Sequence, residues 1–288
     1  MQKNKEFSGY KMVLTKENLQ ELKNKELDAF KAFISVCERL GLRYYILGGT
    51  LLGAVRHHGF IPWDDDIDVG MPRADYEIFC KKAQALLPEK YFLQNIYTEK
   101  EYLLNFSKIR DSETTYLESG VAHLQINHGV FIDIFPLDGY PTKKEEKKFF
   151  FQEKIFVARL ASSVQGVNKC PWWKAFIGYI LMPMPIRKAV EKRELLLKSA
   201  TQSHKTANYC GAWREKEIVP TEWYGEGSLL EFEGLQVRAP KEYDKWLTQV
   251  YGDYMQLPPE EKRVGHHFVD AFDMRAPYTK YTKERSGK

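Results

Sequence analysis

The sequence predicts an α+β fold, in which a mixed sheet is flanked by helices and followed by a mainly helical C-terminal region. Three observations support this: an amphipathic pattern near the start, short aromatic and β-branched segments between residues 91 and 135, and helical patterns from about residue 142. The 288 residues suffice for one large unit. We therefore expect a core over residues 20–140 and a C-terminal region over 141–288 that packs with it.

The first elements follow from periodicity and capping. Residues 16–40 predict a helix because apolar residues recur every three to four positions, and Gly41 would end it. "RYYILGG" predicts a short strand that ends in two glycines. "TLLGAVRHHG" predicts a short helix with Thr50 as its N-cap.

The later elements alternate between strand and helix patterns. Four segments rich in aromatic or β-branched residues predict strands: "YFLQNIY", "NFSKIRD", "TTYLES" and "VFIDIF". Helices are expected over residues 73–87, in "KKEEKKFFFQEKIFVARLASS", in "RKAVEKRELLLKSA" and in "KEYDKWLTQVYG". "LLEFEGLQVRAP" predicts a strand-like segment before the last of these.

Composition narrows the class of protein. Lys and Arg number 43 against 39 Asp and Glu, and this net charge of +4 does not indicate a general nucleic-acid binder. The N-terminus lacks an apolar secretory segment. The four cysteines are far apart and form no CxxC pair, so neither a zinc site nor a disulfide framework is expected. A cytoplasmic location is the resulting expectation.

An apolar stretch over residues 171–186, "PWWKAFIGYILMPMPI", leaves two interpretations open. It is shorter than the roughly 20 residues that a spanning helix needs. It could be a buried helix or hairpin, or a peripheral patch at the inner face of the cell membrane. The second alternative assigns headgroup contact to three aromatic residues and anionic-lipid contact to four basic ones: Trp172, Trp173, Tyr179, Lys174, Arg187, Lys188 and Lys192.

The segment "IPWDDDIDVGM" places four aspartates within five positions. Alternation along a strand puts Asp66 and Asp68 on one face, and Asp64 could join them. Two such carboxylates form a chelate for a hard divalent cation, Mg²⁺ or Mn²⁺, which would also relieve their mutual repulsion. The alternative is a solvated acidic loop.

Two further motifs favour the metal site. Gly48 and Gly49 precede a helix whose N–H groups suit a phosphate. Asp133 lies within the apolar segment "GVFIDIFPLDG", where an unpaired buried charge would be costly, so we expect it to join Asp66 and Asp68. Asp138 is expected in a turn.

A glycine turn, a short helix, an Asp-x-Asp strand and an aspartate on a neighbouring strand are the constellation of nucleotidyltransferases. Asp66 and Asp68 would hold metal on the donor phosphates. Asp133 would bind a second metal or accept the proton of an attacking hydroxyl.

Three long motifs resemble the LicD family, to which fukutin-type proteins also belong. They are "GGTLLGAVRHHGFIPWDDDIDVGM", "GVFIDIFPLDG" and "YGDYMQLPPEEKRVGHH". The resemblance covers residues 20–267, least distinctively over 142–225. It implies a nucleotidyltransferase (polymerase-β-like) fold and a metal-dependent transfer of a substituted phosphate from a CDP-activated donor to a glycan hydroxyl.

In bacterial members that resemble this chain, the group is phosphocholine from CDP-choline. The acceptor is teichoic acid or lipopolysaccharide, and CMP is released. We expect the glycan acceptor to be lipid-linked. The resemblance assigns metal binding to Asp66, Asp68 and Asp133 and the nucleotide-side turn to Gly48, Gly49 and Thr50. The C-terminal region would complete the acceptor site. Other CDP-activated donors, of ribitol phosphate or glycerol phosphate, and a non-catalytic glycan-binding scaffold remain alternatives.

Further candidates are open between two roles. Arg56 could contact donor phosphates or form a surface salt bridge. Lys108 and Arg110 alternate onto one strand face, which suits phosphate contact or a solvated face. Tyr116 or Trp213 could surround a trimethylammonium group. No role follows from the sequence for the histidine pairs His57, His58, His266 and His267.

Overall fold

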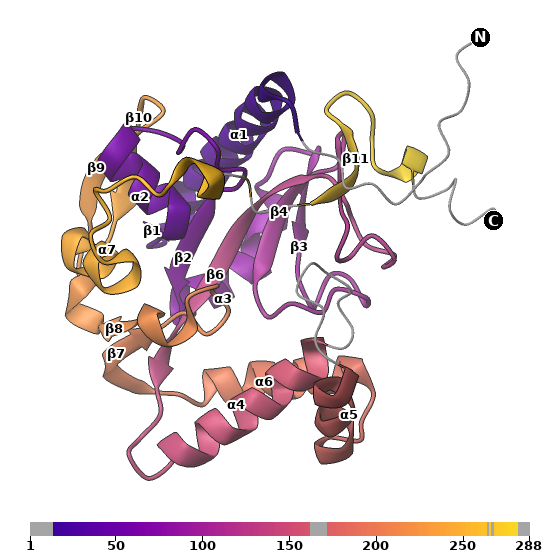
Figure 1. Ribbon diagram of the computed structural model, residues 1–288, viewed down its shortest axis with the longest axis vertical. Helices are drawn as coiled ribbons and strands as arrows, with labels where there is room; N and C mark the ends of the chain where they lie inside the picture. The colour runs from indigo at the N-terminus through magenta and orange to yellow at the C-terminus, as the bar shows by residue number, and fades with distance from the viewer. Residues whose placement is uncertain (1–13, 162–171, 264, 266–267, 282–288) are drawn as a thin grey trace.

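A computed structural model describes residues 14–161, 172–263, 265 and 268–281. It confirms the α+β prediction, with one sheet at the centre and helices packed around it (Figure 1). The first helix, α1 (Lys16–Leu40), has the predicted bounds. The Thr15 hydroxyl accepts a hydrogen bond from the Asn18 N–H, and Gly41 ends the helix in the left-handed region.

The central sheet is mixed. Its strands lie in the order β1 (Tyr45–Ile46), β2 (Asp68–Pro72), β6 (Val130–Tyr140), β4 (Ser107–Asp111) and β3 (Tyr91–Gln94). Only β2 and β6 among these neighbours are parallel. The far end of β6 pairs with β7 (Gln202–Ala207), which in turn pairs with β8 (Ile218–Pro220). The four predicted strands between residues 91 and 135 are confirmed. Strands β3, β4 and β6 lie in this sheet, and the fourth, β5 (Thr115–Glu118), pairs with a strand near the C-terminus.

Helices α1 and α3 (Arg73–Lys82) cover one face of this sheet, where the rings of Phe33 and Phe79 meet at 5.2 Å between centroids. The residues that alternate with the aspartates point into this core, and Ile67 and Val69 are fully buried. Asp66 and Asp68 therefore alternate with Ile67 and Val69, whose buried side chains hold this segment against the core.

The region after residue 141 contains more strand than predicted. Three helices come first: α4 (Glu146–Ala161), α5 (Trp172–Leu181) and α6 (Ile186–Lys198). Then β7 and β8 extend the central sheet, β9 (Ser228–Phe232) and β10 (Leu235–Ala239) form a hairpin, and α7 (Tyr243–Tyr251) ends at Gly252 as predicted. The last strand, β11 (Val269–Asp273), pairs with β5 (Thr115–Glu118). Strands β9 and β10 lie in the segment "LLEFEGLQVRAP", which was predicted to be strand-like. Strands β7 and β11 escaped prediction because the strands they pair with lie far away in the sequence.

The large apolar side chains of α5 are exposed, so the buried interpretation of residues 171–186 is wrong for the side chains that are described. The side chains of Trp172 and Lys174 lie outside the described set. Within the described residues, no helix combines the length and the apolar content that crossing a membrane requires.

Two local predictions need correction. Helix α2 (Gly48–His57) begins two residues before Thr50, with Leu47 as its N-cap. The Thr50 hydroxyl instead accepts the N–H of Asp68 at 2.8 Å, and so ties α2 to β2. Asp138 is not a turn residue, because β6 continues through Pro136 to Tyr140. Its carboxylate accepts two hydrogen bonds of 2.7 Å from the Arg73 guanidinium.

Candidate active site

A cavity of about 950 Å³ opens where the N-terminus of α2, the β2–β6 pair, the 208–217 segment and α7 converge. It collects most of the predicted site residues. Those that line it are Gly48, Gly49, Arg56, Asp64, Asp66, Asp68 and Asp133. The cavity wall has two chemically different parts, which we call the acidic end, at β2–β6, and the aromatic end, formed by Trp213, Glu217 and Tyr251.

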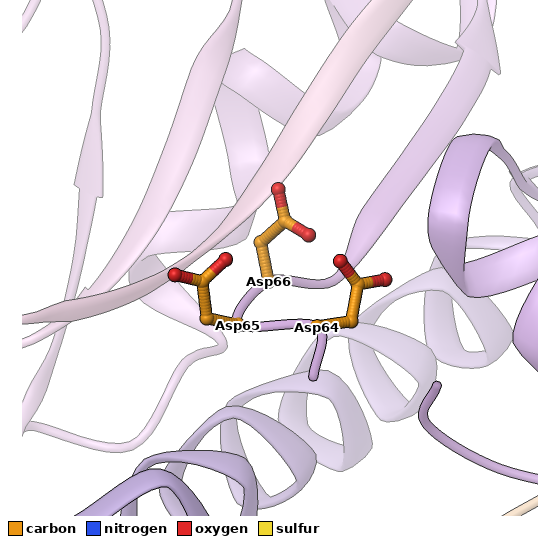
Figure 2. Close-up of side chains that lie close together, drawn as sticks. All are labelled: Asp64, Asp65 and Asp66. Carbon is orange, nitrogen blue, oxygen red and sulfur yellow. The ribbon is translucent and has the colours of Figure 1, made fainter. Parts of the chain in front are cut away.

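The acidic end depends on strand register. Asp68 stands directly opposite Asp133 in the parallel β2–β6 pair. The Asp133 N–H donates to the Ile67 carbonyl at 2.9 Å, which continues this pairing by one residue. Just before β2, the chain makes one turn from which Asp64, Asp65 and Asp66 project together (Figure 2). One oxygen of each of these three carboxylates lies within 4.8 Å of the others.

The two glycines of α2 make room for these carboxylates. A Cβ atom at position 48 would lie 2.7 Å from Oδ2 of Asp68, and one at position 49 would lie 2.3 Å from Oδ2 of Asp64. Gly48 also adopts a positive φ of 54°. The N-terminus of α2 therefore faces protein carboxylates, whose negative charge its dipole stabilises. This is a different role from the phosphate contact predicted for Gly48 and Gly49.

The acidic end carries excess negative charge. Burial, followed by the charges of Asp66 and Asp133, raises the pKa of Asp68 well above its ordinary value. Lys108 offsets part of this charge, since its ammonium lies 2.8 Å from Oδ1 of Asp133. Carboxylate oxygens in this number and proximity are the donor set of a hard divalent cation.

A further carboxyl group, Glu26, lies behind the cluster and was missed from the sequence. It projects from α1, is 1% exposed, and its Oε2 makes no hydrogen bond within the described residues. Burial, followed by the charges of Asp66 and Asp65, raises the pKa of Glu26 well above its ordinary value. The available signal was its helical position, four residues from both Leu22 and Phe30 on the buried face of α1.

Lys108 and Arg110 do share one face of β4, but this face is buried and does not line the large cavity. Arg110 donates to Gln94, to the Gly129 carbonyl and to Glu118. Glu118 also lies 3.7 Å from the Lys108 ammonium. The two cations therefore neutralise and order carboxylates at the edge of the site.

Arg56 lines the cavity and holds its wall in place. Its guanidinium donates to the Tyr254 carbonyl at 2.8 Å and to the Gln256 carbonyl at 3.4 Å. The predicted alternative of a surface salt bridge is not what the described contacts show. Arg56 thus joins α2 to the segment after α7, and part of its side chain remains exposed to the cavity.

The other aromatic and histidine candidates lie elsewhere. Tyr116 is buried against Phe131, outside the cavity lining. His57 packs edge-on against Trp63, and His58 is exposed at the end of α2. His266 and His267 lie outside the described residues.

The aromatic end holds one buried carboxylate. Glu217 is 3% exposed, and its two oxygens accept hydrogen bonds from the backbone N–H of Trp213 at 2.9 Å and from the side-chain amide of Asn208 at 2.8 Å. Burial raises its pKa to about 7. The Trp213 and Tyr251 rings meet edge to face, with centroids 5.1 Å apart. A Cβ at Gly211 would collide with Glu217, so this glycine permits the chain to wrap around the carboxylate.

Comparison with known proteins agrees with these motifs. Residues 41–165 match the family model described as LicD/FKTN/FKRP, nucleotidyltransferase domain. The Lipopolysaccharide cholinephosphotransferase LicD of Haemophilus influenzae is 30% identical over 258 residues, which cover 85% of this chain and 94% of that protein. The chain belongs to the LicD family.

Two further matches cover a smaller share of the chain. The human Ribitol 5-phosphate transferase FKRP is 34% identical over 88 residues, 29% of this chain and 17% of FKRP. The uncharacterized protein RP689 of Rickettsia prowazekii is 36% identical over 116 residues, 40% of this chain and 38% of that protein. Two of these LicD-family relatives are named as phosphotransferases, so the predicted enzyme class is confirmed.

Proposed function

We propose that this LicD-family chain transfers phosphocholine from CDP-choline to a hydroxyl group of a cell-surface glycan, of teichoic acid or lipopolysaccharide type. The reaction forms a bond between the glycan oxygen and the phosphorus that carries choline. It breaks the pyrophosphate bond, removes a proton from the hydroxyl and releases CMP. A nucleotidyltransferase fold is part of this proposal.

One observation carries the proposal: strand register aligns Asp68 with Asp133 at the wall of a cavity large enough for a nucleotide. Side chains fixed on paired strands hold their relative positions, as phosphoryl transfer requires of groups that orient donor and acceptor. The cavity then gives both substrates access to the same carboxylates.

The residues at the acidic end fit a divalent cation, Mg²⁺ or Mn²⁺. Burial, and then the charges of Asp66 and Asp133, raises the pKa of Asp68, and a bound cation would favour its ionised form. Asp66, Asp68 and Asp133 are the residues that would hold the metal, with Asp64 beside them. When bound, the ion would neutralise phosphate oxygens as the pyrophosphate bond breaks.

The protein's own groups would orient the acceptor and handle its proton. The Lys108 ammonium lies 2.8 Å from Oδ1 of Asp133 and orients the carboxylate that would accept the hydroxyl proton. Arg56 fixes the wall opposite by holding the carbonyls of Tyr254 and Gln256. The N-terminus of α2 stabilises the carboxylates, so the donor phosphates would approach them from the cavity side.

The aromatic end favours choline as the donor head group. A quaternary ammonium has no N–H to donate, so it is recognised by aromatic faces and a negative charge. Trp213, Tyr251 and Glu217 supply these groups in one part of the cavity wall. Ribitol or glycerol would instead need several hydrogen-bond partners for their hydroxyls.

A panel of donors tests this assignment. Thermal shift and calorimetry with Mg²⁺ would compare CDP-choline, CDP-ribitol, CDP-glycerol and CMP. We expect CDP-choline to stabilise the protein more than CMP does, because the head group adds contacts. Equal effects of CMP and CDP-choline, with a larger effect of CDP-ribitol or CDP-glycerol, would favour the alternative donors. No stabilisation by any of the four ligands would favour a non-catalytic glycan-binding scaffold.

A further inference from the structure

Helix α5 carries large apolar side chains that the described part of the chain covers only in part. Six large side chains form this surface, which we call the α5 face: Trp173, Phe176, Ile177, Tyr179, Ile180 and Leu181. Each is between 46% and 57% exposed. An exposed apolar patch of this size on one element indicates an interaction surface.

The packing of α5 fixes which side faces outward. Gly178 is buried, and a Cβ there would lie 2.9 Å from the Arg159 backbone nitrogen and 3.1 Å from the Ala158 carbonyl carbon. The helix thus approaches α4 closely at Gly178, the Arg159 guanidinium lies 5.3 Å from the centroid of the Tyr179 ring, and the large apolar side chains stay about half exposed. Arg159 also holds the following turn, by donating to the Met184 carbonyl at 3.0 Å. The outward orientation is therefore built into the α4–α5 contact.

We propose that the α5 face binds the surface of an anionic lipid bilayer. The helix has ten residues, and Lys174 is the one charged residue in its sequence. It is too short to span a membrane, and its composition suits a position in the interface. Tyrosine and tryptophan, both present on this face, prefer the headgroup level. The face follows from these contacts alone and does not depend on the identity of the donor.

The charge around α5 selects this partner over a second copy of the chain. Between Glu153 and Glu191 the sequence has six Lys or Arg residues and no Asp or Glu. Two copies that met through the α5 face would bring these positive segments together, and like charges repel. Anionic lipid headgroups would instead attract them. Among these residues, Lys154 of α4 and Lys188 of α6 have exposed side chains.

Helix α4, on which α5 packs, is tied to α6 by the ion pair between Glu153 of α4 and Arg193 of α6, and α6 is tied to the cavity wall. Asn105 donates to the Val190 carbonyl of α6 at 3.0 Å and accepts from Arg193 at 2.9 Å. Arg193 also donates to the Tyr209 carbonyl at 3.0 Å, next to the cavity residue Cys210. In Figure 1, α4, α5 and α6 lie together at one end of the molecule. A bilayer bound there would hold the enzyme at the surface where a lipid-linked acceptor is found.

Vesicle sedimentation tests the proposal with the full chain. We expect it to co-sediment with phosphatidylglycerol–phosphatidylcholine vesicles, and at least ten-fold more weakly with pure phosphatidylcholine or at high salt. The double change Phe176→Ser and Ile180→Ser should weaken binding at least ten-fold while circular dichroism and the melting temperature stay unchanged. Leu229→Ser, at a 65% exposed residue on β9, is the matched control and should bind like the parent.

Three results would overturn the proposal. The first is unchanged vesicle binding by a folded double variant. The second is equal binding to neutral and anionic vesicles. The third is a dimer, seen by light scattering without lipid, that the double variant converts to a monomer, because the α5 face would then bind a second copy. If the double variant unfolds, the single change Lys188→Glu replaces it and should weaken binding to anionic vesicles several-fold.

Discussion

The two ends of the cavity hold their carboxylates in opposite ways. At the acidic end, several aspartates crowd together on or beside strands, and each raises the cost of ionising its neighbours. At the aromatic end, Glu217 is a single buried carboxylate that accepts hydrogen bonds from a backbone N–H and a side-chain amide, and its charge still acts on Asp68. The first arrangement suits a small, doubly charged ion. The second suits a large, singly charged and weakly hydrated cation.

The two ends should also differ in role, with the acidic end required for turnover and the aromatic end for the choice of donor. The acidic end is fixed by the register of the central sheet, so the positions of Asp68 and Asp133 vary little with the substrate. The aromatic end is built from the 208–217 segment and α7, which meet only through tertiary contacts such as the Lys216 ammonium on the Val250 carbonyl. Changes at the acidic end should therefore abolish turnover, whereas changes at the aromatic end should alter donor choice.

The largest expected effect is at the acidic end. Asp68→Asn or Asp66→Asn removes a ligand charge without changing side-chain shape, and we expect turnover of CDP-choline to fall at least about 1,000-fold. The same variants should be as stable as the parent or slightly more stable without metal, because like-charge repulsion decreases. CMP release and thermal melting with and without Mg²⁺ measure the two effects.

Asp28→Asn is the matched control, since Asp28 is an exposed residue of α1 that pairs with Lys31. It should leave turnover unchanged. Near-normal turnover by the Asp66→Asn or Asp68→Asn variant with Mg²⁺ would rule out the proposed metal site at the acidic end.

A smaller effect, on stability, is expected at the aromatic end. The pKa of Glu217 rises from an ordinary value of 4.5 to about 7 in the folded chain. A raised folded pKa favours folding below the unfolded value, and this advantage is lost as pH rises through 7. At about 1.4 kcal/mol per pKa unit, the loss between pH 4 and 8 is about 3 kcal/mol.

Urea unfolding of the parent and of Glu217→Gln at several pH values measures this loss. The stability of the parent relative to the variant should fall by about this amount from pH 4 to pH 8. A pH-independent difference would mean that the pKa of Glu217 is the same in the folded and the unfolded chain, as it would be beside a permanent counter-charge that offsets its burial. CDP-choline should supply such a charge and reduce the pH dependence of the parent.

The two ends also differ in how far the sequence predicts them. Asp66, Asp68 and Asp133 were predicted because each stands in an apolar strand pattern, where a carboxylate is conspicuous. Glu217 lies in "REKEIVP", among other charged residues, and only its burial by Gly211 and Asn208 distinguishes it. Lys108 and Arg110 were assigned correctly to one strand face, but alternation does not reveal that the face is buried. Periodicity thus predicts faces and elements, and tertiary contacts decide what each face meets.

A still smaller effect, on donor binding, is expected at the aromatic end. Trp213 is 42% exposed and lines the cavity beside Tyr251. Trp213→Ala should weaken CDP-choline binding about ten-fold and leave CMP binding unchanged, because only the head group meets the ring. Trp173→Ala, at a tryptophan of similar exposure on α5, should change neither affinity. Isothermal titration with Mg²⁺ gives both constants.

The Lys216 ammonium adds a sharper test, because it lies 5.2 Å from the centroid of the Trp213 ring. This ammonium repels a second cation and competes for the same aromatic surface. Lys216→Met removes that competition and should strengthen CDP-choline binding a few-fold, opposite to the effect of Trp213→Ala, with CMP again unchanged. If both variants weaken CMP and CDP-choline equally, Trp213 supports the nucleotide rather than the head group. The aromatic end would then not select choline as the donor head group.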